Sequence, residues 1–194
     1  MGEDEPIQLW TDGGCWYGHN IRPGSWAFLI IDPTKDLIIR DSGWEIQTTS
    51  NRMEMTAAIK GLQRVSNEGL LEHGGQIEGR DVLVHSDSQY LVRGAREWME
   101  GWARRGWLTA SGGEVANLDL WKFLHLCPWR KRVLWRHVKG HSGIEHNETV
   151  DAECSRVLKE CLVHHGYAGR EFVGQGYVPR ERRRRGPQPV AGQG

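Results

Sequence analysis

The sequence predicts a single α/β domain in which helices cover a mixed β-sheet. The segments expected to be strands and helices follow one another in the order βββαβααβα, which favours this class. Residues 81–85 (Asp-Val-Leu-Val-His) are brief, β-branched and apolar on both faces, as is typical of a central strand covered on both sides. At 194 residues, with no internal repeat, the chain is long enough for one domain with its own core plus a tail.

Three strands are expected first. Residues 7–11 alternate in polarity and meet Asp-Gly-Gly at 12–14, which predicts a short strand ending in a glycine-rich turn. Residues 26–31, followed by Asp-Pro, predict a second strand, and residues 37–47 a third. The connection between these two is short enough for antiparallel pairing.

The pattern then changes to helical spacing. Met55, Ala58, Ile59, Leu62 and Val65 lie on one helical face, with a start signal at 49–51 and Gly69 near the stop. The remaining elements are expected at 81–85 (strand), 89–102 (helix, broken at Gly94), 118–126 (helix), 132–138 (strand) and 147–164 (helix), with a loop over 104–114.

Composition sets the boundaries. We expect a short N-terminal extension over residues 1–6, one folded domain over 7–165 and a flexible Gly/Pro/Arg-rich tail over 166–194. No apolar stretch reaches the length of a membrane span, and the acidic N-terminus does not resemble a signal peptide. The four cysteines form no CxxC pair, which favours reduced thiols in an intracellular protein, cytoplasmic or nuclear and not secreted.

The formal net charge of zero hides an asymmetry. Residues 178–194 hold five Arg and one Glu, so the remaining body carries 20 basic against 24 acidic residues. A nucleic-acid binder that relied on its overall charge would look different. Any phosphate-binding surface in the body must therefore be local.

Three carboxylates lie where strands end or helices begin, and each has an ordinary explanation. Asp12 precedes a glycine in a turn, Glu54 fits a capping box with Asn51, and Asp87 is a possible helix N-cap. Their combination favours function, because functional groups gather beyond the carboxyl ends of strands in α/β sheets. Two carboxylates side by side repel each other unless a cation such as Mg²⁺ neutralises them.

A fourth acidic residue, Asp151, follows a glycine-rich segment at 138–143. His141 lies between glycines in an expected loop, an unfavourable place for a core histidine, although an ordinary surface histidine remains the alternative. Asp151 falls in the first turns of the last helix, where a carboxylate also interacts favourably with the helix dipole.

These segments resemble type 1 ribonuclease H in order and spacing, over about residues 7–165. The matching segments are Thr-Asp-Gly-Gly-Cys (11–15), Asn-Arg-Met-Glu (51–54), His-Ser-Asp-Ser-Gln-Tyr (85–90), Trp98 through Arg-Arg-Gly-Trp (104–107), Asn-Leu-Asp-Leu-Trp (117–121), and Val-Lys-Gly-His-Ser-Gly (138–143) with Asn147 and Asp151. The resemblance implies a ribonuclease H-like fold: a five-stranded mixed sheet, with three antiparallel N-terminal strands and then parallel strands, flanked by helices. It also implies endonucleolytic hydrolysis of the RNA strand of RNA/DNA hybrids.

The resemblance implies a two-metal site as well. Asp12, Glu54, Asp87 and Asp151 would bind two Mg²⁺ ions, for which Mn²⁺ can substitute, and His141 would assist turnover. Asp12 would bridge both ions, and Glu54 would help to orient one metal and meet the 2′-hydroxyl. The expected products carry a 5′-phosphate and a 3′-hydroxyl.

The implied substrate contacts divide between the two strands. Gly13, Ser50, Asn51 and Gln89 would approach the minor groove, whose 2′-hydroxyls on one strand distinguish a hybrid from either pure duplex. Trp98 would face the DNA strand, and DNA phosphates would meet Thr49, Asn117, Arg104 and Arg105. Helix capping is the alternative role for Ser50 and Asn51, and hydrophobic support is the alternative for Trp98, Trp102, Trp107 and Trp121.

The chain departs from the family pattern in two places. The loop over 15–23 is about two residues longer than in common bacterial relatives, which leaves the role of Asn20 open. Residues 111–116 (Ser-Gly-Gly-Glu-Val-Ala) replace a lysine-rich stretch of many relatives, which argues against tight hybrid binding. Too few residues precede Ile7 for a separate hybrid-binding module, and we expect a monomer without an obligate protein partner.

Two other functions remain to be weighed. A catalytically weak hybrid-binding module would keep the groove and lose at least one carboxylate, whereas all four are present. A resolvase, transposase or exonuclease of the same superfamily would lack the Lys-Gly-His-Ser-Gly segment at 139–143 and the tryptophan-rich region.

Overall fold

The computed structural model describes residues 5–17, 20–70 and 80–167. A five-stranded sheet in the order β3-β2-β1-β4-β5 forms its centre, with β1–β2 and β2–β3 antiparallel and β1–β4 and β4–β5 parallel. The predicted mixed sheet is thereby confirmed. The elements are β1 (Ile7–Cys15), β2 (Gly24–Asp32), β3 (Leu37–Glu45), α1 (Ser50–Asn67), β4 (Val82–Ser86), α2 (Gln89–Arg93), η1 (Gly94–Trp98), α3 (Met99–Arg104), α4 (Leu118–Leu126), η2 (Arg130–Arg132), β5 (Val133–His137) and α5 (Glu145–His164).

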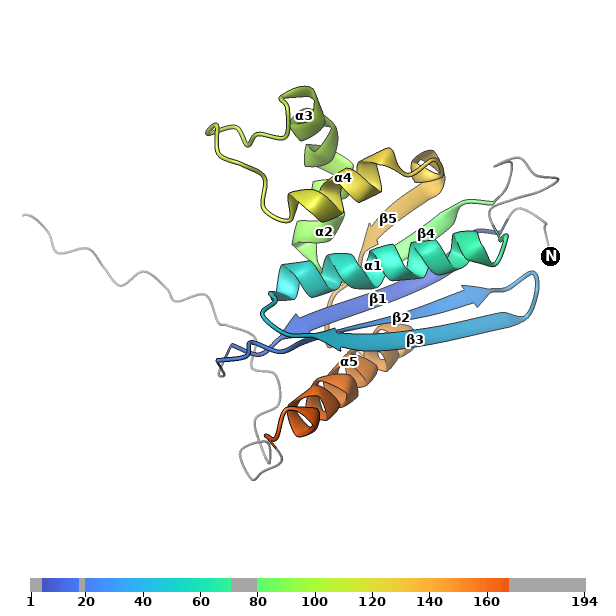
Figure 1. Ribbon diagram of the computed structural model, residues 1–194. Coiled ribbons are helices and arrows are strands. Elements are labelled where there is room, and N and C mark those ends of the chain that lie inside the picture. Colours follow the sequence, from blue (N-terminus) through green and yellow to red (C-terminus); the bar gives the residue numbers. More distant parts are fainter. Residues whose placement is uncertain (1–4, 18–19, 71–79, 168–194) are drawn as a thin grey trace, which may run out of the picture.

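Helices cover both faces of the sheet (Figure 1). The long helix α1 packs along β1 and β2 on one face, next to α2 and α4, while α5 crosses β1, β2 and β3 on the other. Side chains along β1 point alternately to the two faces of the sheet. Ile7 and Leu9 join the core beneath α1, and Trp10 joins the core beneath α5. No helix among the described residues is long and apolar enough to cross a membrane.

The first strand differs from its prediction. Residues 12–14 do not form a turn but continue β1, which pairs with β2 as far as Cys15↔Gly24. Gly13 is required here for another reason, because an added Cβ would lie 2.3 Å from the backbone of Met53 in α1. Close packing of strand and helix, rather than turn chemistry, therefore explains this glycine.

The helix predicted over 89–102, with a break at Gly94, is observed and extends to Arg104. A π-helical turn, η1, separates α2 from α3. A Cβ on Gly94 would lie 2.3 Å from the ring of Trp121, so the helix passes the indole only because this residue is glycine. The π turn carries Trp98 at its end.

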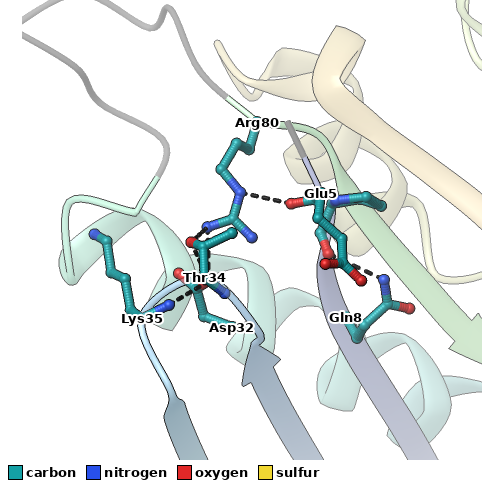
Figure 2. A network of polar contacts seen from close by, with 7 residues as sticks. Glu5, Gln8, Asp32, Thr34, Lys35 and Arg80 are labelled. Atoms are coloured by element: carbon teal, nitrogen blue, oxygen red, sulfur yellow. Dashed lines mark hydrogen bonds and ion pairs between the residues drawn. The ribbon is translucent and has the colours of Figure 1, made fainter. Parts of the chain in front are cut away.

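A polar network fastens the end of the sheet at which β1 and β4 begin (Figure 2). The carboxylate of Asp32 is fully buried, and one of its oxygens accepts hydrogen bonds from Arg80 Nη1 (2.6 Å) and from the hydroxyl and backbone N–H of Thr34 (2.8 and 3.0 Å). Arg80 Nε also donates to the main-chain oxygen of Glu5 (2.6 Å). The network thus ties the β2–β3 turn to the residues that precede β1 and β4.

Candidate active site

Asp12 and Asp87 lie at the opposite end of the sheet, on neighbouring parallel strands. Trp10 of β1 is in register with His85 of β4. Asp12 follows Trp10 by two residues, and Asp87 follows His85 by two residues. The sequence left open whether these strands are adjacent, and the register answers that question. Asp87 does not cap α2, because Ser88 Oγ accepts from Leu91 N (3.2 Å) and makes Ser88 the N-cap.

Glu54 reaches this end from α1. It does not complete a capping box with Asn51, because Thr49 is the N-cap and its hydroxyl accepts from Arg52 N (3.3 Å). The Glu54 carboxylate instead accepts a short hydrogen bond from the hydroxyl of Ser88. The approach of Gly13 to α1 brings the backbone of β1 against the turn that carries Glu54.

Asp151 and His141 complete the group from the other side. Asp151 lies in the second turn of α5, and its Oδ2 is 3.4 Å from Nδ1 of His141 in the loop between β5 and α5. His141 is 52% exposed and Asp151 is 32% exposed, so solvent and substrate can reach both. The predicted loop position of the histidine is confirmed.

The sequence reasoning missed the roles of Glu148, His137 and Gly140 around this loop. Glu148, His141 and Asp151 offer ligand atoms within 4.8 Å of one another, and Glu148 Oε1 also accepts from Gly143 N (3.1 Å). The detectable signal was the i, i+3 spacing of Glu148 and Asp151 on one helix face. His137 Nε2 donates to the main-chain oxygen of Asp87 (3.1 Å), and Gly140 lies so close that a Cβ would be 2.4 Å from Asp87 Oδ2.

We call Asp12, Glu54, Asp87 and Asp151 the four-carboxylate cluster. Burial, followed by the charges of Asp87 and Asp151, raises the pKa of Asp12 to about 7. Burial, with the charges of Asp12 and Asp87, raises the pKa of Glu54 to about 8. The pKa values of Asp87 and Asp151 are also raised, again mainly by burial, and nearby His141 partly offsets both shifts.

Burial is the largest cause of these shifts, and the charges of neighbouring carboxylates add to it. The four carboxylates offer only oxygen donors, which suit a hard divalent cation such as Mg²⁺ that commonly binds through carboxylates and keeps several waters. The donor set therefore fits the metal that the sequence implied.

Several of the residues expected to contact substrate lie at helix starts. Thr49, Ser50 and Asn51 form the N-terminal end of α1, and Gln89 begins α2. Asn117 precedes α4 in a left-handed conformation (φ 56°). A bidentate pair, Arg52 to Asp119 (3.0 and 2.6 Å), joins the first turns of α1 and α4 and so keeps Thr49 and Asn117 on one side of the molecule.

The tryptophans divide into core and surface. Trp121 is fully buried and packs edge-on against Tyr90 and Trp102, which confirms hydrophobic support as its role. Trp98 is half-buried, and the Arg93 guanidinium lies 5.0 Å from its ring centroid. Trp98 therefore retains accessible ring surface.

Arg104 and Arg105 are exposed at the end of α3. Neither forms an ion pair within the described part of the chain, and Arg105 Nε donates only to the main-chain oxygen of Leu108 (3.4 Å). Arg52, Arg93 and Arg130, in contrast, each pair with a carboxylate. The two exposed arginines thus keep their charges available for a ligand.

Comparison with known proteins gives a consistent result. The family model described as RNase H matches residues 4–159. The chain is 37% identical to a ribonuclease H of Granulibacter bethesdensis over 162 residues, covering 82% of this chain and 97% of that protein. It is 43% identical to a ribonuclease HI of Xylella fastidiosa over 147 residues, covering 75% and 87%.

Solved structures agree on the fold. LC9-RNase H1, described as a type 1 RNase H with the type 2 active-site motif, superposes with a TM-score of 0.61 at 26% identity, covering 82% of this chain and 75% of that one. LC11-RNase H1, solved in complex with an RNA/DNA hybrid, gives a TM-score of 0.59 at 20% identity, covering 80% and 99%.

Proposed function

Because the chain belongs to the ribonuclease H family, we propose that its four-carboxylate cluster binds two Mg²⁺ ions and is the centre at which RNA is cut. The chain is a ribonuclease H, a hydrolase that cleaves the RNA strand of RNA/DNA hybrids. The observation that supports the metal proposal is the register of β1 and β4, which brings Asp12 and Asp87 to the same end of neighbouring parallel strands, and the raised pKa values of Asp12 and Glu54 agree with it.

The four carboxylates would share the ions between them. When bound, two divalent ions supply an activated water as nucleophile and stabilise the leaving 3′ oxygen. By resemblance, Asp12 would contribute to the binding of both ions, while Asp151 would contribute from α5. The products would carry a 5′-phosphate and a 3′-hydroxyl, and Mn²⁺ would substitute for Mg²⁺.

The loop between β5 and α5, which carries His141, would affect the turnover rate. His141 is half-exposed and contacts the most accessible edge of the cluster through Asp151, so its ring can meet a product phosphate without occupying the centre. Glu148 accepts from Gly143 N and thereby supports the shape of this loop. We assign to His141 an auxiliary role in proton transfer or product release.

The hybrid would lie across the helix starts. Gly13, Ser50, Asn51 and Gln89 would face the minor groove, because Gly13 packs against α1 at the cluster and the other three begin the helices beside it. Thr49 and Asn117 would hold one DNA phosphate, Trp98 would face the DNA strand, and Arg104 with Arg105 would bind further phosphates.

We also propose that the protein works as a monomer inside the cell. All four cysteines are free thiols, as expected in a reducing compartment. Gel filtration at several concentrations tests the monomer, because a concentration-dependent elution volume would contradict it.

The test of the proposed function compares three labelled duplexes: RNA/DNA hybrid, double-stranded RNA and double-stranded DNA. In Mg²⁺ we expect cuts only in RNA paired with DNA, and mass spectrometry of the fragments is expected to show 5′-phosphate ends. Chelation by EDTA is expected to stop cleavage, and Mn²⁺ to restore it. Cleavage that persists in EDTA would refute the metal assignment without touching the substrate assignment.

A further inference from the structure

Tyr17 is an exposed aromatic residue that the assignments above do not use. It lies in the loop between β1 and β2 and is 58% exposed. Its hydroxyl oxygen accepts a hydrogen bond from the backbone N–H of Ser50 (3.1 Å), the first residue of α1. We propose that Tyr17 is a substrate-binding residue that donates its O–H to a ribose 2′-hydroxyl oxygen of the RNA strand.

The hydrogen-bonding capacity of the phenol supports this role. A tyrosine hydroxyl has one proton to donate as well as lone pairs to accept. At Tyr17 the oxygen accepts from Ser50 N, and no described residue lies in position to accept the proton. The Ser50 contact uses a lone pair of the oxygen, so the hydroxyl proton remains available for an external acceptor.

The position of Tyr17 relative to the cluster fixes where that acceptor lies. Ser50 precedes Glu54 by four residues on α1, which is about one helical turn, or about 6 Å. Successive nucleotides along one strand are roughly 3.4 Å apart. A strand whose scissile phosphate lies at Glu54 therefore passes Tyr17 within about three nucleotides of the cut.

Residues 20 and 21 of this loop are anchored to neighbouring segments. Gln47 Nε2 donates to the main-chain oxygen of Asn20 (3.0 Å), and Gln47 N donates to that of Ile21 (2.8 Å). Tyr167 beyond α5 donates from its hydroxyl to Asn20 Oδ1 (3.1 Å). A loss of loop anchoring can therefore be tested at Tyr167, apart from Tyr17.

The chemistry of the residue favours a sugar over a phosphate. Phosphates are bound chiefly through cationic side chains, whereas Tyr17, Ser50 and Asn51 are uncharged. An apolar ring with one neutral donor suits the wide minor groove, where sugar carbons and 2′-hydroxyls are displayed together. This inference rests on the proposed placement of Ser50 and Asn51 in the minor groove.

The first test uses Tyr17→Phe, which removes only the hydroxyl. We expect KM for a hybrid with a defined cut site to rise about fivefold while kcat stays within a factor of two, because the lost contact is made equally before and during the reaction. Tyr167→Phe is the matched control, since it removes a hydroxyl that anchors the same loop, and its KM is expected to stay unchanged. Equal increases for both variants would assign Tyr17 to loop anchoring and overturn the proposal.

The second test identifies the acceptor. Hybrids with a single 2′-deoxy substitution, placed in turn at the RNA positions flanking the cut, are bound in EDTA and followed by fluorescence anisotropy. One position within about three nucleotides of the cut is expected to weaken binding to the original chain but not to Tyr17→Phe. Identical losses at every position for both proteins would overturn the proposal. Failure of the original chain to cut any hybrid would instead refute the proposed function.

Discussion

The two ends of the β-sheet treat buried carboxylates in opposite ways. Where β2 ends, burial would raise the pKa of Asp32, but the hydrogen bonds from Arg80 and Thr34 outweigh burial and the net pKa is lowered (Figure 2). Where β1 ends, Asp12 has acidic neighbours instead of a cation, and its pKa rises to about 7. Asp32 has a cationic partner within the protein, whereas the leading causes of the raised Asp12 pKa include no cationic side chain.

The Asp32–Arg80 pair and the four-carboxylate cluster therefore have opposite effects on the stability of the fold. The Asp32–Arg80 pair joins three segments and stabilises the fold, because both charges are hydrogen-bonded. The four-carboxylate cluster costs stability when its members are ionised together, since like charges in a poorly solvated site repel. A fold tolerates such a cost where the charges serve a ligand, so unpaired buried charges mark the site.

The largest expected effect is the loss of activity in Asp12→Asn. Removing the Asp12 carboxylate is expected to lower kcat by about a thousandfold or more, because it deletes a proposed metal ligand rather than a binding contact. Hybrid binding in EDTA, measured by anisotropy, is expected to stay within about threefold. Asp36→Asn, in the exposed β2–β3 turn, is the control and is expected to keep full activity. Full activity in Asp12→Asn would defeat the assignment.

At the other end, Arg80→Met is expected to reduce stability and leave activity intact. It leaves Asp32 buried and uncompensated, a change that costs about 3–5 kcal/mol near neutral pH. Because the folded pKa of Asp32 lies below its usual value, the pair stabilises the protein above pH 4, and the difference between the two proteins is expected to shrink as the pH falls further. Urea unfolding measures both effects.

Arg64→Met is the matched control, because the Arg64–Glu68 pair is exposed and its loss is expected to cost less than about 0.5 kcal/mol. Folded Arg80→Met protein is expected to cleave hybrid at the rate of the original chain. A selective loss of kcat in folded Arg80→Met would show that the two ends of the sheet are coupled. It would contradict the conclusion that the Asp32–Arg80 pair affects stability alone.

A pH series tests the cluster directly. Asp12 and Glu54 have folded pKa values of about 7 and 8, above those of the unfolded chain, so the metal-free folded state binds more protons. The free energy of unfolding in EDTA is therefore expected to fall as the pH rises from about 4 to about 8. Mg²⁺ binds the ionised carboxylates, so its stabilising effect is expected to grow over the same range.

Asp12→Asn sharpens this measurement. Without one of the repelling charges, its stability in EDTA is expected to decline less with pH, and Mg²⁺ is expected to stabilise it less. Stabilisation by Mg²⁺ that is equal at pH 5 and pH 8 would mean that the ions bind elsewhere.

The sequence predicted the elements well because their periodicity is local. The doubly apolar strand at 81–85 and the helical face from Met55 to Val65 both appear where expected. Gly13 misled the prediction, because its neighbour is α1, about forty residues away, and no local pattern records that contact. Long-range pairing overrode turn propensity there.

The site was predictable only in part, for the same reason. Asp12, Glu54, Asp87, His141 and Asp151 were found because they belong to ordered motifs, although their adjacency required the register of β1 and β4. The partner of Asp32 could not be found in this way, since Arg80 is 48 residues away and its segment carries no distinctive pattern. Motifs reveal side chains that share a reaction, whereas structural ion pairs become visible only once the chain is folded.

The smallest expected effect concerns the cations. Arg104 and Arg105 lack ion-pair partners among the described residues, so by the reasoning applied to Asp12 their charges serve a ligand. Replacing both with Ala is expected to weaken hybrid binding several-fold at 0.1 M salt and to reduce the slope of log K against log salt by up to about 2. Arg52→Ala, whose charge is paired with Asp119, is expected to change this slope less. An unchanged slope in the Arg104/Arg105 variant would show that unpaired charge marks function only for the carboxylates, and that phosphates are bound elsewhere on the surface.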